Sequence, residues 1–306
     1  MGLKKIISFA VAIVVGFLVS ARLRRRKPYR RDGGWPTSLA HRGASAHAPE
    51  NTLEAYWLAV ESGAGGLELD VHMTRDGQVV VMHDDDVDRL TDGAGLVREK
   101  SLQELENLEV GYRFSPDGGS TFPYRGRGLK IPTLQEVLQQ FPNTPINLDI
   151  KEDQAGFDEA VLRIIQKNGA EDRTFVASQK HRVVRKFRKL SGGAVPTSSS
   201  QLEVGMFLLL SWLRLESLLR PSYVALQIPT SHRGIELVTP RFISAAHNLG
   251  VRVDVWTIDE PKEIHRLLDL GADVIMTNRP EVLAEVLEQR RRVQVKDHER
   301  HGGHPE

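Results

Sequence analysis

Short apolar runs alternate with helical patterns between residues 38 and 290. The runs predict buried strands, and apolar positions three and four residues apart predict helices that pack one face on a core. Strands are predicted at residues 38–42, 66–71, 146–150, 174–178, 195–199, 223–228, 251–257 and 272–277. Helices are predicted at residues 52–62, 133–140, 156–168, 180–190, 201–219, 240–249, 261–269 and 280–290. This alternation favours an α/β fold of the closed TIM (β/α)8 barrel type over an open sheet. Residues 195–199 form a poor strand sequence, so an incomplete barrel is the alternative.

A turn signal interrupts the alternation after the second strand. Asp76-Gly77 lies between β-rich arms and predicts a hairpin with a two-residue turn and a return arm at residues 78–83. Counting outward from this turn places Asp70 opposite His83, and directly opposed residues have Cβ atoms roughly 5 Å apart. Residues 84–143 hold few periodic apolar positions. They are predicted to form an insertion that folds over one end of the barrel.

An apolar segment precedes the predicted barrel. Residues 6–21 carry no charge, and as a helix they span about 24 Å, slightly less than a ~30 Å bilayer core. Residues 1–23 are therefore predicted to be a membrane anchor. The alternative is a cleaved signal peptide, because Val19-Ser20-Ala21 resembles a cleavage site.

The flanking segments complete the predicted organisation. Residues 24–37 form a basic linker, and the positive charges after the apolar segment place the catalytic domain in the cytosol by the positive-inside rule. The barrel domain is predicted at residues 38–291. Residues 292–306 are polar and charged, which predicts a disordered tail.

Composition narrows the functional classes. The chain has 306 residues, 40% of them hydrophobic, which is enough for a sizeable core. It has no cysteine, so a disulfide framework and thiol catalysis are excluded. The net charge is only +1, which argues against nucleic acid as a partner.

Acidic side chains gather where function is expected in such barrels, at the carboxyl ends of strands. Glu68 and Asp70 lie two residues apart in one strand, so both point to the same face. Asp149 follows on the next barrel strand. Buried carboxylates this close repel each other and require a cation or a proton. Three hard oxygen donors suit Mg²⁺ or Ca²⁺ better than zinc.

Basic and aromatic side chains fall at the same strand ends. Arg42 and Lys151 suit a phosphate group. His41 and His83 suit a general acid and a general base. Trp256 ends another strand, where it is either a core residue or an aromatic wall over a substrate.

These motifs resemble the glycerophosphodiester phosphodiesterase family. The resemblance covers roughly residues 38 to 290, and with the apolar N-terminus the chain is most similar to membrane-anchored members, some of which act as lysophospholipase D. The matching segments are Ala40-His41-Arg42-Gly43, Pro49-Glu50-Asn51-Thr52, Leu67-Glu68-Leu69-Asp70-Val71, Asp76-Gly77, Val80-Val81-Met82-His83-Asp84, Ile131-Pro132-Thr133-Leu134, Asn147-Leu148-Asp149-Ile150-Lys151 and Val255-Trp256-Thr257.

The resemblance implies hydrolysis of a glycerophosphodiester or lysophospholipid to a phosphomonoester and an alcohol. It implies His41 and His83 as the acid–base pair. Glu50 matches a family acid near the site that orients Arg42 or the ligand. The implied divalent metal lies on residues matching Glu68, Asp70 and Asp149, although the family usually has Glu at the last position. His83 is an alternative metal ligand.

Two points stay open from the sequence. A sphingomyelinase-D-like phosphodiesterase or a non-catalytic, membrane-bound phospholipid sensor are the rival functions. The segment from Leu202 to Leu219 is more apolar than one core-facing stripe requires. It is either a deeply packed helix or a segment that dips into a membrane near the site, and the second reading adds membrane lipid as a partner.

Overall fold

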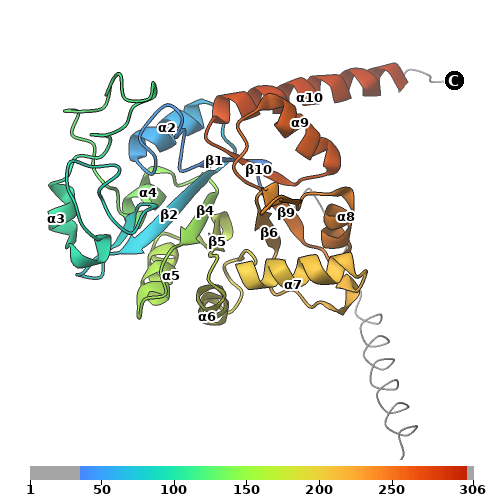
Figure 1. Cartoon of the computed structure of the whole chain (residues 1–306), viewed down its shortest axis with the longest axis horizontal. Coiled ribbons are helices and arrows are strands. Elements are labelled where there is room, and N and C mark those ends of the chain that lie inside the picture. The colour runs from blue at the N-terminus through green and yellow to red at the C-terminus, as the bar shows by residue number, and fades with distance from the viewer. Residues whose placement is uncertain (1–34, 302–306) are drawn as a thin grey trace, which may run out of the picture.

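The computed structural model describes residues 35–301, and a curled parallel sheet forms its centre (Figure 1). Seven parallel strands follow the order β5–β4–β2–β1–β10–β9–β6. Their bounds are β1 Ser38–His41, β2 Leu67–Met73, β4 Ile146–Ile150, β5 Thr174–Ala177, β6 Ala225–Ile228, β9 Arg252–Val255 and β10 Val274–Thr277. Each lies within two residues of a predicted strand, because these are the buried apolar runs of the sequence.

Residues 197 and 198 link the two edge strands of this sheet. Thr197 forms a parallel bridge with Val176 of β5, and Ser198 forms one with Ala225 of β6. The Ser199 N–H donates to the Ala225 carbonyl at 2.8 Å. The eighth predicted strand position is thus filled by an irregular segment, since Pro196 has no N–H for a regular ladder. The arrangement is TIM-like.

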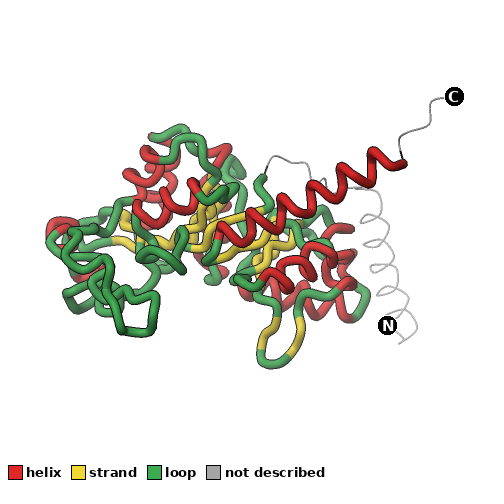
Figure 2. The backbone as a smooth tube through the Cα atoms, turned by 90° about the horizontal axis from the view of Figure 1, so that it is seen from above, coloured by secondary structure: helices red, strands yellow, loops and turns green. Residues whose placement is uncertain are grey.

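Helices cover the outside of the sheet (Figures 1 and 2). They begin where the sequence provides caps: Thr52, Thr133, Ser200 and Thr239 each accept a backbone N–H at a helix start. Their bounds are α2 Leu53–Glu61, α4 Leu134–Gln140, α5 Phe157–Lys167, α6 His181–Ser191, α7 Gln201–Trp212, α8 Pro240–Asn248, α9 Pro261–Leu270 and α10 Pro280–His301. Short 3-10 turns occupy Glu171–Arg173 and Glu216–Leu218.

The predicted hairpin register is wrong by one residue. The antiparallel partner of β2 is β3, Val79–Val81, and Met73 pairs with Val79. The Thr74 N–H donates to the Gln78 carbonyl and Gly77 has φ +78°, as in a three-residue loop with a bulge. His83 therefore lies beyond the paired residues.

The insertion carries a small core of its own. Its elements are a 3-10 turn at Val97–Glu99 and helix α3, Leu102–Glu106, followed by a long loop. Buried apolar side chains of the insertion pack against Val80 and Met82 of the hairpin. Figure 1 shows this region beyond the end of β2, at one end of the sheet. The members of the cluster are Val80, Met82, Val87, Leu90, Val97, Leu105, Val110 and Ile131.

The structure corrects the predicted tail. Helix α10 continues to His301, so residues 292–301 are helical rather than disordered. Glu288 forms ion pairs with Arg291 and Arg292, at 2.8 Å and 2.7 Å, and such pairs three and four residues apart stabilise a helix. Residues 302–306 lie outside the described part.

The predicted localisation is also corrected. The predicted anchor and N-terminal hydrophobic helix, residues 1–23, lie outside the described residues, as does the basic linker up to residue 34. Within residues 35–301, no helix has the length and apolar character needed to cross a membrane. Neither membrane anchoring nor the cytosolic orientation derived from it is supported.

Candidate active site

A cavity of about 520 Å³ opens at the carboxyl ends of the parallel strands. All the predicted site residues except Glu50 line it: His41, Arg42, Glu68, Asp70, His83, Asp149, Lys151 and Trp256. Glu50 lies directly behind the wall, where it contacts Arg42. The strand-end rule thus identified one cluster, even though the hairpin count that supported His83 was wrong.

The turn after β1 fixes the first part of the site. Arg42 adopts a left-handed backbone with φ 58°, which directs its N–H to Glu68 Oε2 at 3.0 Å. Gly43 follows with φ +85°, and a Cβ there would lie 2.7 Å from the backbone carbon of Ala55. Only glycine fits this position, because both the conformation and the space exclude a side chain.

His41 is oriented by a hydrogen-bond relay that runs through Asn278 to Asp259. Its Nδ1 lies 2.8 Å from Asn278 Oδ1, and Asn278 Nδ2 donates to Asp259 Oδ2 at 2.8 Å. A carboxylate only accepts hydrogen bonds, so Asp259 fixes the orientation of the amide and leaves Oδ1 for His41. The His41 proton therefore lies on Nδ1, and the Nε2 lone pair is available.

Burial and the neighbouring Arg42 charge hold the pKa of His41 below its ordinary value of 6.5. The imidazole is therefore neutral at pH 7. A neutral histidine with a free Nε2 is the form that accepts a proton.

The two acids of β2 differ in their electrostatic surroundings. Burial and the adjacent Asp70 raise the pKa of Glu68 well above its ordinary value. Burial would also raise the pKa of Asp70, but Lys151 and Arg42 lower it. The Lys151 ammonium lies 2.7 Å from Asp70 Oδ1 and 2.6 Å from Asp149 Oδ2, so it joins two of the three acids.

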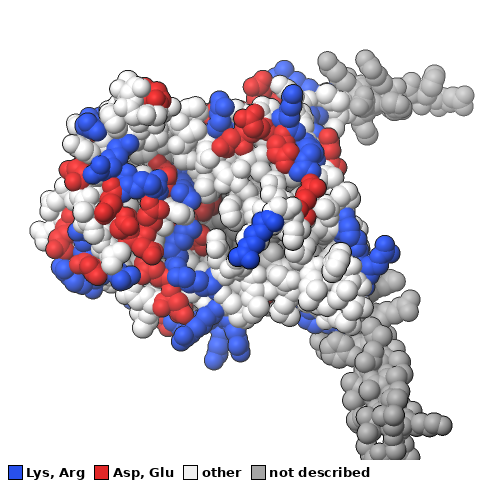
Figure 3. All heavy atoms as spheres, in the orientation of Figure 1, with Lys and Arg blue, Asp and Glu red and all other residues white. Residues whose placement is uncertain are grey.

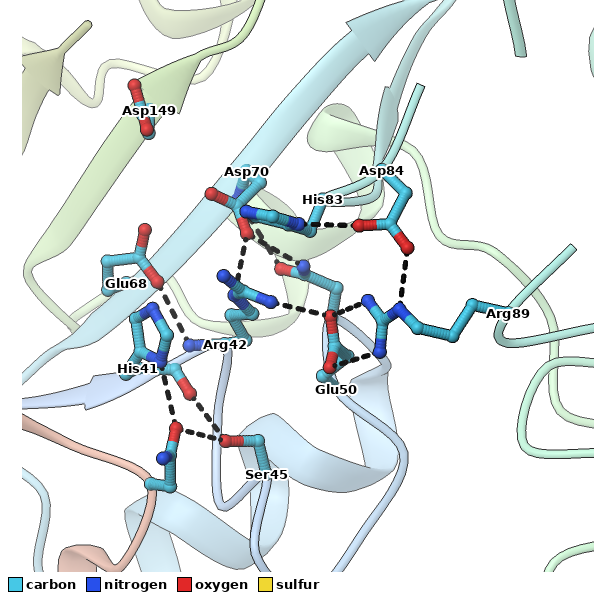
Figure 4. A network of polar contacts seen from close by, with 12 residues as sticks. His41, Arg42, Ser45, Glu50, Glu68, Asp70, His83, Asp84, Arg89 and Asp149 are labelled. Carbon is cyan, nitrogen blue, oxygen red and sulfur yellow. Dashed lines mark hydrogen bonds and ion pairs between the residues drawn. The ribbon is translucent and has the colours of Figure 1, made fainter. Parts of the chain in front are cut away.

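His83 bonds to a chain of ion pairs that runs through Asp84, Arg89 and Glu50 to Arg42 (Figure 4). Its Nδ1 lies 2.7 Å from Asp84 Oδ1, and Arg89 joins Asp84 to Glu50 through bonds of 2.6 Å and 2.7 Å. Glu50 then accepts from Arg42 at 2.9 Å. Burial alone would raise the pKa of Asp84, yet the bonds from Arg89 and His83 lower it to about 2. Asp84 is therefore a carboxylate at neutral pH, and it keeps the Nδ1 proton on His83.

Residues 41–282 match the family model described as the glycerophosphoryl diester phosphodiesterase family. The match runs from the last residue of β1 to the start of α10 and includes every residue that lines the cavity. This chain belongs to the glycerophosphoryl diester phosphodiesterase family.

Curated relatives of the family align over most of their length. The chain is 32% identical over 256 residues to the glycerophosphodiester phosphodiesterase of Caldanaerobacter subterraneus, covering 81% of this chain and 96% of the relative. It is 28% identical to human lysophospholipase D GDPD1, covering 81% and 85%. Among solved structures, an Oleispira antarctica phosphodiesterase in complex with the product sn-glycerol-3-phosphate has a TM-score of 0.66 and 26% identity, covering 84% of this chain and 99% of that one.

The phosphodiesterase site has carboxylate oxygens that could bind a metal ion, but the Lys151 ammonium already pairs with two of the three acids. Asp149 Oδ1 is buried and has no hydrogen-bond partner, and burial together with the adjacent Asp70 raises the pKa of Glu68. Both observations fit a hard divalent cation. Lys151 occupies the space between Asp70 and Asp149, however, and within residues 35–301 no three acidic or histidine side chains are grouped to hold a metal as they stand. A cation here has to displace the Lys151 ammonium from at least one acid.

Several positioning groups escaped the sequence analysis. Asp259 and Asn278 follow β9 and β10. The search for functional side chains at the carboxyl ends of strands would have found them if it had included amides and residues a few positions beyond each strand. Arg89 comes from the insertion, and no local pattern connects it with Glu50. Asn51 donates to Asp70 at 3.0 Å, and its backbone is left-handed. No sequence pattern predicts this conformation.

His72 is a further positioning group that no sequence pattern identifies. It is completely buried, and its Nδ1 bonds to Glu152. Its Nε2 lies 3.1 Å from the carbonyl of His83. A carbonyl only accepts, so His72 donates from Nε2 and fixes the backbone that carries His83.

Proposed function

We propose that this phosphodiesterase cleaves glycerophosphodiesters, lysophospholipids among them, by acid–base catalysis with His41 and His83. The observation that carries the proposal is the pair of imidazoles, each with Nδ1 bonded to an acceptor and each lining the cavity that holds Arg42 and Lys151. This arrangement leaves both Nε2 atoms for proton transfer. The product complex of the Oleispira relative supports sn-glycerol 3-phosphate as the soluble product.

In the first step, neutral His41 accepts the proton of the substrate 2-hydroxyl at Nε2. The hydroxyl oxygen attacks phosphorus and forms a cyclic phosphate. The bond from phosphorus to the headgroup oxygen breaks, and His83, which enters this step with protons on both ring nitrogens, donates the Nε2 proton to the departing alcohol. Each such proton transfer contributes about 10²–10⁴-fold to the rate.

In the second step, the two histidines exchange roles. His83 accepts a proton from water, the hydroxide oxygen bonds to phosphorus, and the ring bond to the 2-oxygen breaks. His41 returns its proton to that oxygen, which restores the 2-hydroxyl. The products are an alcohol and sn-glycerol 3-phosphate, or lysophosphatidic acid from a lysophospholipid. The route requires a free hydroxyl beside the phosphate, so diacyl lipids are not substrates.

Arg42 and Lys151 supply positive charge for the phosphate oxygens. Glu68, Asp70 and Asp149 would hold Mg²⁺ or Ca²⁺, with His83 as a further ligand in the alternative arrangement. A bound cation would neutralise phosphate charge and acidify the attacking hydroxyl. Trp256 provides an aromatic wall at the cavity, and Glu50 holds the Arg42 guanidinium in place.

The test is turnover of glycerophosphocholine, measured as free choline and glycerol 3-phosphate. His41→Asn is expected to reduce kcat by about 10²–10⁴-fold at unchanged Tm. His47→Asn is the matched control, because His47 lies in the same turn but is half exposed and bonds to Glu281. EDTA should suppress turnover and added Mg²⁺ or Ca²⁺ should restore it.

Three results would contradict the proposal. Native turnover in the His41→Asn variant would contradict the role of His41 as the base. Turnover that is unchanged by EDTA would contradict the requirement for a metal. Choline release from sphingomyelin without any from glycerophosphocholine favours the sphingomyelinase-D-like alternative, and binding of both without turnover favours the sensor.

A further inference from the structure

Helix α7 borders the cavity with one face and presents an apolar face to solvent. Val204, Gly205 and Leu208 line the cavity. On the outer face, Leu202 and Leu209 are each 55% exposed. Only Phe207 and Ser211 of this helix are buried, so the interpretation as a deeply packed helix is wrong.

The outer face continues to the end of the helix. Trp212 is 82% exposed, the highest value among the large hydrophobic side chains of residues 35–295. Figure 3 shows almost no charged side chains over α7, whereas Lys, Arg, Asp and Glu crowd the insertion at the other end of the same face. Exposed apolar surface of this extent marks a binding site more often than a solvated helix.

Gly205 lies where the two faces of α7 meet. It shares one stripe with Leu208, three residues on, and a second stripe with Leu202 and Leu209, three residues before and four after. Glycine is the least favourable helix-interior residue after proline. A Cβ at this position would have no atom within 4 Å, so neither packing nor backbone conformation requires glycine here. The missing side chain leaves a notch in the wall of the cavity.

Other segments also contribute apolar side chains to the cavity. Ile228 at the end of β6, Leu237 further along the chain and Trp256 directly after β9 line it. The polar groups lie on the floor, at the strand ends. The cavity therefore has a phosphate-binding floor and an apolar exit, which matches an amphiphile whose polar end is the reacting group.

We propose that Gly205 is the exit of a groove for the single acyl chain of a lysophospholipid substrate. The chain leaves the cavity over Gly205 and lies along Leu209 toward Trp212 on the outside of α7. From Gly205 to Trp212 the helix rises about 10 Å, enough to contact part of a long acyl chain. The continuity of the apolar stripe with the cavity favours an acyl chain over a separate protein partner. This inference rests on the proposed function and assigns its substrate class.

The test compares glycerophosphocholine with hexanoyl, decanoyl and myristoyl lysophosphatidylcholine, all below their critical micelle concentrations. A fully buried methylene group contributes about fourfold to binding, and a half-buried one about twofold. The kcat/KM of the unaltered protein should therefore rise steeply from the hexanoyl to the myristoyl substrate. Glycerophosphocholine, which has no chain, reports on the chemistry alone.

Gly205→Leu fills the notch and should lower the ratio of kcat/KM for the myristoyl substrate over glycerophosphocholine at least tenfold. Gly205→Ala adds one methyl group, so it should lower the same ratio by a smaller factor while raising Tm by about 2 °C, because alanine favours the helix. The Ala variant keeps the test valid if the Leu variant folds poorly. Leu209→Asp should also reduce the ratio, and Val293→Asp, an equally exposed apolar residue on α10, should not.

The outcomes separate this inference from the proposed function. If the unaltered protein fails to hydrolyse glycerophosphocholine, the proposed function is overturned. Turnover with no dependence on chain length, or equal losses for both substrates in the Gly205 variants, overturns the groove alone. An effect of Leu209→Asp seen only above the critical micelle concentration also overturns the groove, because it assigns α7 to docking on a lipid surface.

Discussion

Removal of the Asn278 amide tests whether the relay from Asp259 sets the protonation of His41. Asn278→Ala deletes the acceptor that lies 2.8 Å from His41 Nδ1 and leaves a buried N–H without a partner. Loss of such a bond costs about 1–3 kcal/mol. If the bond strengthens as His41 gains its proton, so that its full strength is reached only in the transition state, the cost appears in the rate, as a loss of up to about 5- to 150-fold in kcat/KM.

The same variant should shift the pH profile. The bond to Asn278 raises the pKa of His41, so its removal lowers that pKa further. His41 acts as a base only when neutral, and activity rises as pH increases through its pKa. The acidic limb of kcat/KM for glycerophosphocholine is therefore expected at lower pH in the variant than in the unaltered protein.

Ser45→Ala is the matched control for this experiment. The Ser45 hydroxyl lies 2.8 Å from the same Asn278 oxygen and 2.9 Å from the His41 carbonyl, but it makes no hydrogen bond to the His41 ring. It should leave the limb in place and cost less activity. A native rate, or a limb that moves to higher pH in Asn278→Ala at native Tm, would refute the assigned relay.

Three further changes follow from the contacts of the site. Gly43→Ala should lower the free energy of unfolding by more than about 2 kcal/mol in urea titration, because φ +85° and the Ala55 backbone both exclude a Cβ; a neutral result would contradict this. Asp84, whose pKa falls from 3.8 to about 2 on folding, stabilises the fold above pH 4 and loses this effect as pH falls through 2. In the Asp84→Asn variant, the free energy of unfolding should therefore change less with pH between about pH 4 and pH 2. An unchanged slope would contradict this prediction. His72→Phe removes the donor to the His83 carbonyl and should lower kcat more than it raises KM, whereas equal activity at native Tm would show that His72 only fills space.

The strands were predictable because each one is buried on both sides of the barrel. Burial on both sides produces an apolar run that ends abruptly in polar residues, as in Ile146–Ile150, where prediction and structure coincide. The same feature locates the site, since polar residues at those ends have one cavity to share. The acids, His41 and Lys151 were found this way without knowledge of their distances.

Other features depended on contacts that no local pattern records. The hairpin register follows from a bulge at Gly77 rather than from the Asp76-Gly77 dipeptide, which permits loops of two or three residues. Arg89 reaches Glu50 from a part of the chain 39 residues away. The end of α10 was missed because charge content indicates disorder, whereas the order of the charges, Glu288 before Arg292, supports a helix.

The charges in the cavity give a physical reason to expect a cation with the substrate. Three carboxylates, Glu68, Asp70 and Asp149, lie beside the two cations Arg42 and Lys151, so these five groups, when all are ionised, carry one excess negative charge. A phosphodiester brings a second negative charge into the same enclosed space, where repulsion is poorly screened. Burial, and after it the adjacent Asp70, raises the pKa of Glu68 in this space. A divalent cation would balance both charges at once, and it would release Lys151 from Asp149 for the phosphate. We therefore expect the three acids to bind a cation together with the substrate rather than to serve only as a stabilising network.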